Sequence, residues 1–232
     1  MVLSLAAGMD YLHTEIRSSV AKPSIAHRDL KSKNILIKTT VQGSQCCLAD
    51  FGLASRSDYF ASMPDKAGFH FQVGTRRYMA PEILDSSINL GTFESLRRAD
   101  MYMMGLVMWE VGQRVTPCPV PYKYPYQEEV PPDPTVQEMA EVVVDRDQRP
   151  PDPPSWGSVP LANVRRIAHE CWHPDPSSRL TSLRVSSLRL NTTSTEGFFF
   201  SLSIHLHSLT TKFDGLTLSP GEEGSTRCPG GG

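Results

Sequence analysis

The stretch AHRDLKSKN puts several side chains suited to phosphoryl transfer on one short loop. Transfer to a hydroxyl needs a carboxylate that orients the hydroxyl and accepts its proton, a cation that offsets charge, and oxygen ligands for a metal ion. Asp29 can be the carboxylate. Lys31 projects to the same side of an extended loop as Asp29 and can reach a γ-phosphate. Asn34 offers an amide oxygen suited to a second Mg²⁺.

A charged metal ligand is predicted at Asp50, in the stretch DFG. The apolar runs at residues 35–37 and 46–49 are joined by the polar stretch TTVQGSQ, which indicates a hairpin. Its return brings Asp50 beside Asn34, and Gly52 allows the chain to turn sharply afterwards. The two oxygen-bearing side chains therefore suit a Mg²⁺ ion held between protein and phosphates.

The elements that must position these residues are mostly helical. Residues 2–17 show an apolar face at helical spacing, and residues 97–113 are apolar around nearly the whole circumference, which predicts a buried helix. The Met residues of that helix are expected in the core. Residues 50–82 are expected to be mostly irregular, and the Pro-rich residues 114–134 exclude a helix. Further helices are predicted at residues 135–145, 161–172 and 177–189.

Composition narrows the class of protein. The net charge of −2 over 232 residues and a pI near 6.4 give no sign of a broad nucleic-acid or anionic-lipid surface, so no nucleic-acid partner is expected. Five Cys without C-x-x-C spacing favour free thiols over a zinc site or a disulfide framework. The longest apolar run, MYMMGLVMW, is too short to cross a bilayer. The chain as written is expected to be soluble and cytoplasmic.

Three stretches in this order, HRDLKSKN, DFG and GTRRYMAPE, resemble the catalytic loop, the metal-binding loop and the activation-segment end of protein kinases. The pair Lys31 and Thr75 marks the Ser/Thr class. The resemblance implies ATP with Mg²⁺ as cofactors, with Mn²⁺ as an alternative ion. It implies catalytic roles for Asp29, Lys31, Asn34 and Thr75. It also implies nucleotide or metal binding by Lys31, Asn34, Leu36 and Asp50, with Asn34 and Asp50 as the metal ligands and Leu36 as the floor of the adenine pocket.

The resemblance also implies structural roles. Asp100 would hold the backbone of the HRD loop, and Glu82 would form a buried ion pair with Arg179. His27 would pack under Phe51 rather than act as a base. Arg28 is either a plain surface charge or a ligand for a charged group on the activation segment, and the motif does not decide between these readings.

A closer resemblance is to the receptor Ser/Thr kinases of the transforming growth factor-β, activin and bone morphogenetic protein family. It rests on IAHRDLKSKNIL, VGTRRYMAPEILD, FESLRRADMYMMGLVMWE, VPPDPTVQEM, HECWHPDP and SSRLTSLRV, and covers about residues 2–189. These phrases are similar to type I receptors, although DFG is the type II form, so the subtype stays open. Implied partners are receptor-regulated Smad substrates and other receptor kinase subunits. The parent receptor would be a single-pass plasma-membrane protein with a cytosolic kinase domain.

The predicted fold is therefore mainly α, a kinase-like large lobe at residues 1–190 with a short β-hairpin at the active site. The small lobe is expected to be absent, since no G-x-G-x-x-G or V-A-I-K-like strand occurs. Residues 191–232 are expected to be an unrelated, disordered tail. Two hypotheses follow: part of a receptor Ser/Thr kinase, whose isolated chain is inactive, or a truncated binding module that sequesters Smads or receptor partners.

Overall fold

The computed structural model describes residues 2–19, 21–41, 43–66, 68–114, 121–157 and 159–188. All of them lie in the compact unit Met1–Thr192. The expected tail, 191–232, falls outside the described residues. Among the residues that are described, no helix has both the length and the apolar character needed to cross a membrane.

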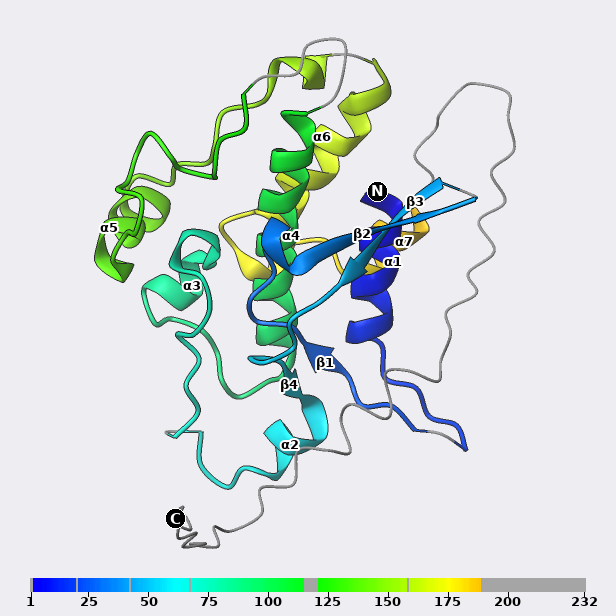
Figure 1. Cartoon of the computed structure of the whole chain (residues 1–232). Helices are drawn as coiled ribbons and strands as arrows, with labels where there is room; N and C mark the ends of the chain where they lie inside the picture. Colours follow the sequence, from blue (N-terminus) through cyan, green and yellow to red (C-terminus); the bar gives the residue numbers. More distant parts are fainter. Residues whose placement is uncertain are drawn as a thin grey trace, which may run out of the picture. The chain divides into compact units, whose positions relative to one another are not determined.

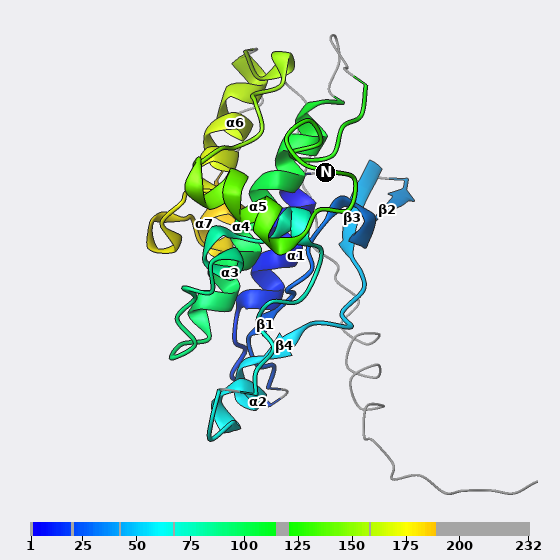
Figure 2. The same cartoon turned by 90° about the vertical axis from the view of Figure 1, so that its left-hand side faces the viewer.

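The long helix α4 (Glu94–Gly112) forms the centre of the fold (Figure 1). Its side chains are buried on nearly all sides, as the sequence predicts, and it begins three residues earlier than expected. Helix α6 (Val159–Cys171) lies along it (Figure 2). The two backbones approach closely at Gly105, where a methyl group would come within 3.0 Å of the Ala168 carbonyl oxygen.

Helix α1 (Val2–His13) packs against helix α7 (Ser182–Ser187) and strand β3. The apolar residues of α1 face the core, as predicted, but the helix ends at His13 rather than at residue 17. The ammonium group of Lys22 accounts for the difference. It donates to the carbonyls of Leu12 and Thr14, so the last-turn carbonyls find partners in the following loop instead of in a further helical turn.

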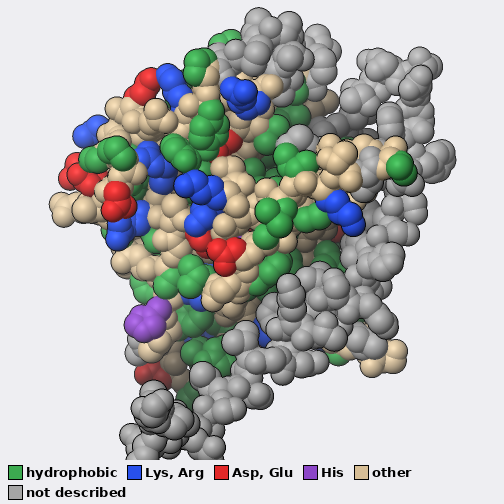
Figure 3. Space-filling view, viewed as in Figure 1, with side chains coloured by type: hydrophobic (Ala, Val, Ile, Leu, Met, Phe, Trp, Pro, Cys, Tyr) green, Lys and Arg blue, Asp and Glu red, His purple; other side chains and the backbone are tan. Residues whose placement is uncertain are grey.

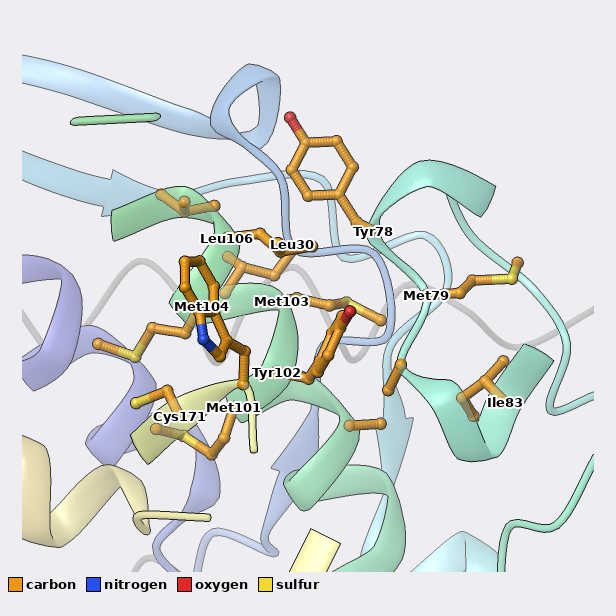
Figure 4. Close-up of a cluster of buried hydrophobic side chains, with 14 of the residues drawn as sticks. Leu30, Tyr78, Met79, Ile83, Met101, Tyr102, Met103, Met104, Leu106 and Cys171 are labelled. Atoms are coloured by element: carbon orange, nitrogen blue, oxygen red, sulfur yellow. The ribbon is translucent and has the colours of Figure 1, made fainter. Parts of the chain in front are cut away.

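The core is formed by α4 together with residues from the loops that cross it. Figure 4 shows Leu30, next to the predicted catalytic residue, beside Leu106 of α4. Met101, Met103 and Met104 are buried, which confirms their prediction as core residues. Because Leu30 is fully buried, the loop that carries Asp29 is fixed to the core by an apolar side chain as well as by polar contacts.

The predicted hairpin is present as strands β2 (Ile35–Thr40) and β3 (Gly43–Leu48), paired antiparallel with Ile35 opposite Leu48. A second pair joins β1 (Ile25–Ala26) to β4 (Ser55–Arg56). These two-stranded sheets are the only sheets in the described part of the chain. The fold is therefore mainly α with few strands, as predicted.

The remaining elements are short. The residues predicted as irregular, 50–82, contain β4, α2 (Ser57–Ser62), a 3₁₀ turn at Arg76–Tyr78 and the start of α3 (Pro81–Leu84). The helix predicted at 135–145 consists of α5 (Val136–Ala140), capped by Thr135, and a π-helical continuation, Glu141–Asp145. Further 3₁₀ turns lie at Ser32–Asn34, Pro154–Gly157 and Pro176–Ser178.

The helix predicted at 177–189 is wrong in its first half. Arg179 has extended backbone angles, and the helix α7 begins only after Thr181, whose side chain caps it by accepting from the backbone N–H of Arg184. The extended backbone at Arg179 leaves its guanidinium free to turn inward. It donates through both terminal nitrogens to the two carboxylate oxygens of Glu82, each at 2.7 Å.

The Glu82–Arg179 pair is buried and joins two segments far apart in sequence. Arg179 is 2% exposed and Glu82 6%. The guanidinium also donates to the carbonyls of Arg98 and His173, so nearly all its donors are used. Such a bidentate pair supports the start of α3, directly after the segment that contains Thr75.

Replacing Arg179 with Met is expected to lower the free energy of unfolding by about 3–5 kcal/mol, because the Glu82 carboxylate would remain buried without its partner. Urea denaturation of the chain measures this. The matched control is Arg166→Met, which breaks the exposed i,i+4 pair with Glu170 and should cost no more than about 0.5 kcal/mol. Equal losses in the two variants would contradict a stabilising role for the buried pair.

Candidate active site

The loop after β1 is held by one buried carboxylate from the central helix. Asp100 is fully buried and accepts hydrogen bonds from the backbone N–H groups of His27 (2.7 Å) and Arg28 (2.8 Å). This is the contact that the resemblance implied. Asp100 also lies 2.9 Å from Nε2 of His13, a partner that the sequence did not indicate. Arg28 has a left-handed backbone (φ 70°), which a non-glycine residue adopts here because both adjoining N–H groups are bonded.

Three of the predicted residues meet around one carboxylate. The ammonium group of Lys31 lies 2.7 Å from Asp29 Oδ2 and 2.7 Å from the hydroxyl of Thr75. The other oxygen of Asp29, Oδ1, accepts from both the hydroxyl and the backbone N–H of Thr75, each at 2.8 Å. Thr75, which lies 44 positions after Lys31 and 46 after Asp29 in the sequence, thus forms one triangle of polar groups with them.

The environment keeps Asp29 ionised. Burial acts to raise the pKa of this carboxyl, but the hydrogen bonds from Lys31 and Thr75 and the Lys31 charge outweigh it, so the pKa lies below its ordinary value of 3.8. The contribution of Asp29 to stability is therefore present above that ordinary value and is lost as the pH falls through the lowered pKa. At neutral pH the side chain is an acceptor only.

Gly74 determines how closely the segment with Thr75 can approach Asp29. Its φ is 101°, and a methyl group there would sit 2.6 Å from the Arg28 carbonyl oxygen and 3.3 Å from Asp29 Oδ1. Only glycine satisfies both the backbone angle and the close approach. Sequence reasoning treated this residue as part of a motif and missed its positioning role, for which the signal was its place directly before Thr75.

The hairpin brings the backbone just before Asp50 next to Asn34. The amide of Asn34 donates to the Asp29 carbonyl at 2.9 Å and, more weakly, to Asp29 Oδ2 at 3.3 Å. Its amide oxygen is the atom left to ligate a cation. The backbone N–H of Ala49 donates to the Asn34 carbonyl at 2.9 Å, so Asp50 follows directly, exposed and with φ 62°.

The donor set suits a divalent ion that takes part of its coordination from phosphate. One amide oxygen and one carboxylate are hard ligands of the kind Mg²⁺ prefers. Within the described residues no group of three or more His, Cys, Asp or Glu side chains could hold a metal ion by itself. Asn34 and Asp50 alone would leave most of the coordination of such an ion to other oxygen donors, such as those of a phosphate group.

The other predicted residues lie nearby in different environments. His27 packs on Phe51, with ring centroids 5.2 Å apart, and lies 3.0 Å from the Ala49 carbonyl, as expected of a structural residue. Leu36 on β2 is 59% exposed and opposite Cys47, so it does not join the polar triangle.

Arg28 is not a plain surface charge. Its guanidinium donates to the backbone carbonyls of Leu53 and His70 and lies 4.5 Å from the Phe69 ring centroid. Burial lowers its pKa. Arg28 therefore binds the backbone of the segment between DFG and Gly74, and its role as a ligand for a charged group on the activation segment stays a prediction.

A buried carboxylate that the sequence analysis missed lies on the other side of the loop. Glu110, near the end of α4, is 3% exposed and accepts from the hydroxyls of Ser32 (2.7 Å), Tyr78 (2.6 Å) and Tyr122. Burial raises its pKa, against the three hydroxyl donors, which lower it. Glu110 therefore ties the loop to the turn after Thr75 and to the Pro-rich segment, and no motif marked it.

Comparison with known proteins agrees with this geometry. Residues 1–189 match the protein kinase domain family. TGF-beta receptor type-1 of Homo sapiens and of Rattus norvegicus are each 46% identical to this chain over 200 residues. Activin receptor type-1 of Homo sapiens is 45% identical over 188 residues. The matches cover 85% and 80% of this chain but only 39% and 36% of the relatives, so the chain spans about two fifths of their length.

Gly74→Ala is expected to displace Thr75 from Asp29 and to destabilise the fold. Gly43→Ala is the matched control, because Gly43 also has a left-handed backbone (φ 114°) but has open space where the methyl would go. In both variants the free energy of unfolding should fall by about 1 kcal/mol because of the backbone angle. In Gly74→Ala it should fall by at least about 1 kcal/mol more, because the methyl group would clash with the Arg28 carbonyl oxygen. Urea denaturation gives the difference, and equal losses would show that the close approach carries no constraint.

The pKa of Asp29 should rise when its donors are removed. Following the ¹³Cγ shift of Asp29 against pH, the midpoint is expected to increase in Thr75→Val and further in Lys31→Met, because the latter removes both a hydrogen bond and a charge. The exposed residue Thr39 supplies the control, Thr39→Val, which should leave the midpoint unchanged. An unchanged midpoint in Lys31→Met would rule out the assigned cause of the lowered pKa.

Proposed function

Because the chain belongs to the protein kinase family, within the group that includes the TGF-β and activin receptors, we propose that it acts as the large lobe of a receptor Ser/Thr kinase. The proposed reaction moves the γ-phosphate of ATP to a Ser or Thr hydroxyl of a protein substrate. The observation that carries this proposal is the triangle of Asp29, Lys31 and Thr75, whose contacts place an ionised carboxylate and an ammonium group side by side.

Asp29 is the proposed acceptor of the hydroxyl proton. Among the residues that the structure describes, its Oδ2 contacts Lys31 and, weakly, Asn34, so a substrate hydroxyl can approach it without breaking the Thr75 contacts to Oδ1. Lys31 offsets the charge of the transferred group from its place beside the same carboxylate. Thr75 holds Asp29 and Lys31 in one orientation, which is the positioning on which phosphoryl transfer depends.

Asn34 and Asp50 are the proposed ligands of the divalent ion. Bound there with the nucleotide, Mg²⁺, or Mn²⁺ in its place, would neutralise charge on the phosphates. Asn34 is held by its two bonds to Asp29, and the exposed Asp50 follows the hairpin closely enough in sequence to complete the proposed ligand pair. Leu36, exposed on β2, is the proposed apolar contact of the adenine ring.

The proposed substrates are receptor-regulated Smad proteins, and the proposed partners are other receptor kinase subunits. Similarity to TGF-beta and activin type-1 receptors supports both. The same similarity supports a parent protein at the plasma membrane, with these residues on the cytosolic side. Residues 1–190 are the proposed kinase lobe and 191–232 a segment unrelated to it.

As a separate polypeptide, these 232 residues are expected to bind ATP weakly and to transfer phosphate very slowly. The sequence has no G-x-G-x-x-G and no strand of the V-A-I-K type, which in kinases cover and orient the phosphates. The second candidate function, a non-catalytic module that sequesters Smads or receptor partners, is favoured by this observation.

The proposed activity is tested on the native polypeptide that carries VGTRRYMAPEILDSSINL, captured with an antibody from cells that express either wild type or Asp29→Asn. Wild type should transfer labelled phosphate from ATP to Ser residues of a receptor-regulated Smad. The variant should do so roughly 100- to 10 000-fold more slowly, because it lacks the proton acceptor. Asp58→Asn, an exposed substitution of the same kind, is the control and should retain activity.

The size of the captured polypeptide separates the two functions. A membrane-associated band about twice the 25.7 kDa of this chain or larger, active in wild type and inactive in Asp29→Asn, supports the receptor kinase. A band of 25.7 kDa that retains Smads equally with and without Asp29 contradicts it and supports the binding module.

A further inference from the structure

A cavity of about 190 Å³ lies where the end of α1, the first turns of α4 and the start of α7 meet. We call it the α1–α4–α7 cavity. An engineered cavity of about 150 Å³ can hold a benzene molecule, so this one has room for a single aromatic ring. The residues that line it include Asp10, His13, Glu94, Met101, Ser182 and Leu183. None of these is a residue proposed above to transfer phosphate.

The hydroxyl of Ser182 is a buried polar group that the fold leaves available to this cavity. Ser182 lines the cavity and is only 4% exposed. No side chain or backbone group of the described residues forms a hydrogen bond with its hydroxyl, whereas the neighbouring Thr181 already caps α7 by accepting from the Arg184 backbone. A buried hydroxyl without a partner is costly, so a molecule that bonds Ser182 from within the cavity would be stabilised there.

The imidazole of His13 offers a second polar atom to the same cavity. His13 is 4% exposed, and its Nε2 lies 2.9 Å from the carboxylate of Asp100. Because a carboxylate only accepts, the ring proton lies on Nε2, and Nδ1 of the neutral ring is an acceptor. Within the described part of the chain Nδ1 has no hydrogen-bond partner. A ligand that donates to Nδ1 would fix this tautomer and, with it, the contact between His13 and Asp100.

The charged residues around the cavity neutralise one another. Glu94 accepts from both Arg97 and Arg98, and Asp10 accepts from the hydroxyl of Ser186 at 2.9 Å. Two carboxylates and two guanidinium groups leave no net charge. The wider surface does not add a field of one sign, since acidic and basic side chains are interspersed on the face shown in Figure 3. The lining therefore favours a neutral ligand over an ion.

Met101 gives the cavity an apolar contact. It is 1% exposed on α4 and lines the cavity together with Leu183, which is 64% exposed on α7. A thioether adapts to irregular shapes and packs favourably against an aromatic ring. The cavity thus combines a thioether, one hydroxyl group and one imidazole acceptor.

We propose that the α1–α4–α7 cavity binds a small neutral molecule with one aromatic ring and a hydroxyl group, of the chemical class of the phenols. The ligand hydroxyl donates to His13 Nδ1 and accepts from the Ser182 hydroxyl, and the ring contacts Met101.

Binding in this cavity is coupled to the loop after β1 through one carboxylate. The ligand stabilises the contact of His13 with Asp100, and Asp100 accepts from the backbone N–H groups of His27 and Arg28. The inference does not depend on whether that loop transfers phosphate, because each contact named is present in the chain itself.

Titration of the ¹⁵N-labelled full chain with phenol and with fluorobenzene tests the site. The two rings are similar in size, and only phenol has a hydrogen-bond donor. Phenol should give saturable shifts at the amides of Met101, Ser182 and Leu183, and should bind about threefold to tenfold more tightly than fluorobenzene. The amides of His27 and Arg28 should shift with phenol and much less with fluorobenzene, because only phenol fixes the His13 tautomer.

Ser182→Ala is expected to weaken phenol binding about threefold or more and to leave fluorobenzene binding almost unchanged. The matched control is Ser187→Ala on the same helix, where the serine is exposed and its hydroxyl donates to the Arg184 carbonyl, and this variant should bind both ligands as wild type does. Equal affinity of wild type for phenol and fluorobenzene, or equal losses in the two variants, would overturn the proposal. So would the absence of saturable shifts, since the cavity would then hold water alone. Tighter binding of benzoate than of phenol would overturn it as well, because the preferred ligand would then be an anion.

Discussion

The carboxylate of Asp100 is the constraint on which the rest of this site depends. It is fully buried in the central helix α4 and receives N–H donors from His27, Arg28 and His13. These bonds hold Arg28 in a left-handed conformation that costs a non-glycine residue roughly 1–2 kcal/mol. That backbone turn directs Asp29 toward Thr75 and Leu30 into the core. Without Asp100 the buried N–H groups would lack partners, and the loop would lose its direction.

The same helix fixes the loop at a second point. Asp100 binds its beginning, while Glu110 binds Ser32. Ten residues of helix separate the two anchors, which is about 15 Å. The chain from His27 to Ser32 can span at most about 17 Å when extended. Between the two anchors the backbone turns at Arg28 and is extended at Lys31 (φ −154°, ψ 163°). An extended chain carries Asp29 and Lys31 on one side, as their contact requires.

Apolar periodicity predicted α4 and the β2–β3 hairpin, and the resemblance to protein kinases implied the contacts of Asp100 and the buried Glu82–Arg179 pair. Periodicity failed to predict where helices begin and end when one side chain reaches across the fold. Lys22 ends α1 early by capping its carbonyls, and Arg179 keeps its backbone extended so that its guanidinium can reach Glu82. Glu110 looked like any residue of a helix, because its three hydroxyl partners come from segments that only the tertiary structure brings together. Period and propensity carry no information on such contacts.

The two ends of the site differ in what holds them. At the proposed acceptor end, Thr75 and the loop of residues 27–32 are held by carboxylates that are buried and hydrogen-bonded, and replacing such groups by apolar residues often makes a protein no less stable. Their effect on this site is the geometry they impose. At the proposed nucleotide end, Leu36 and Asp50 are exposed and take no part in that network. The described residues therefore hold the proposed acceptor site through buried polar contacts, while the residues proposed to meet the nucleotide lie on the exposed hairpin and directly after it.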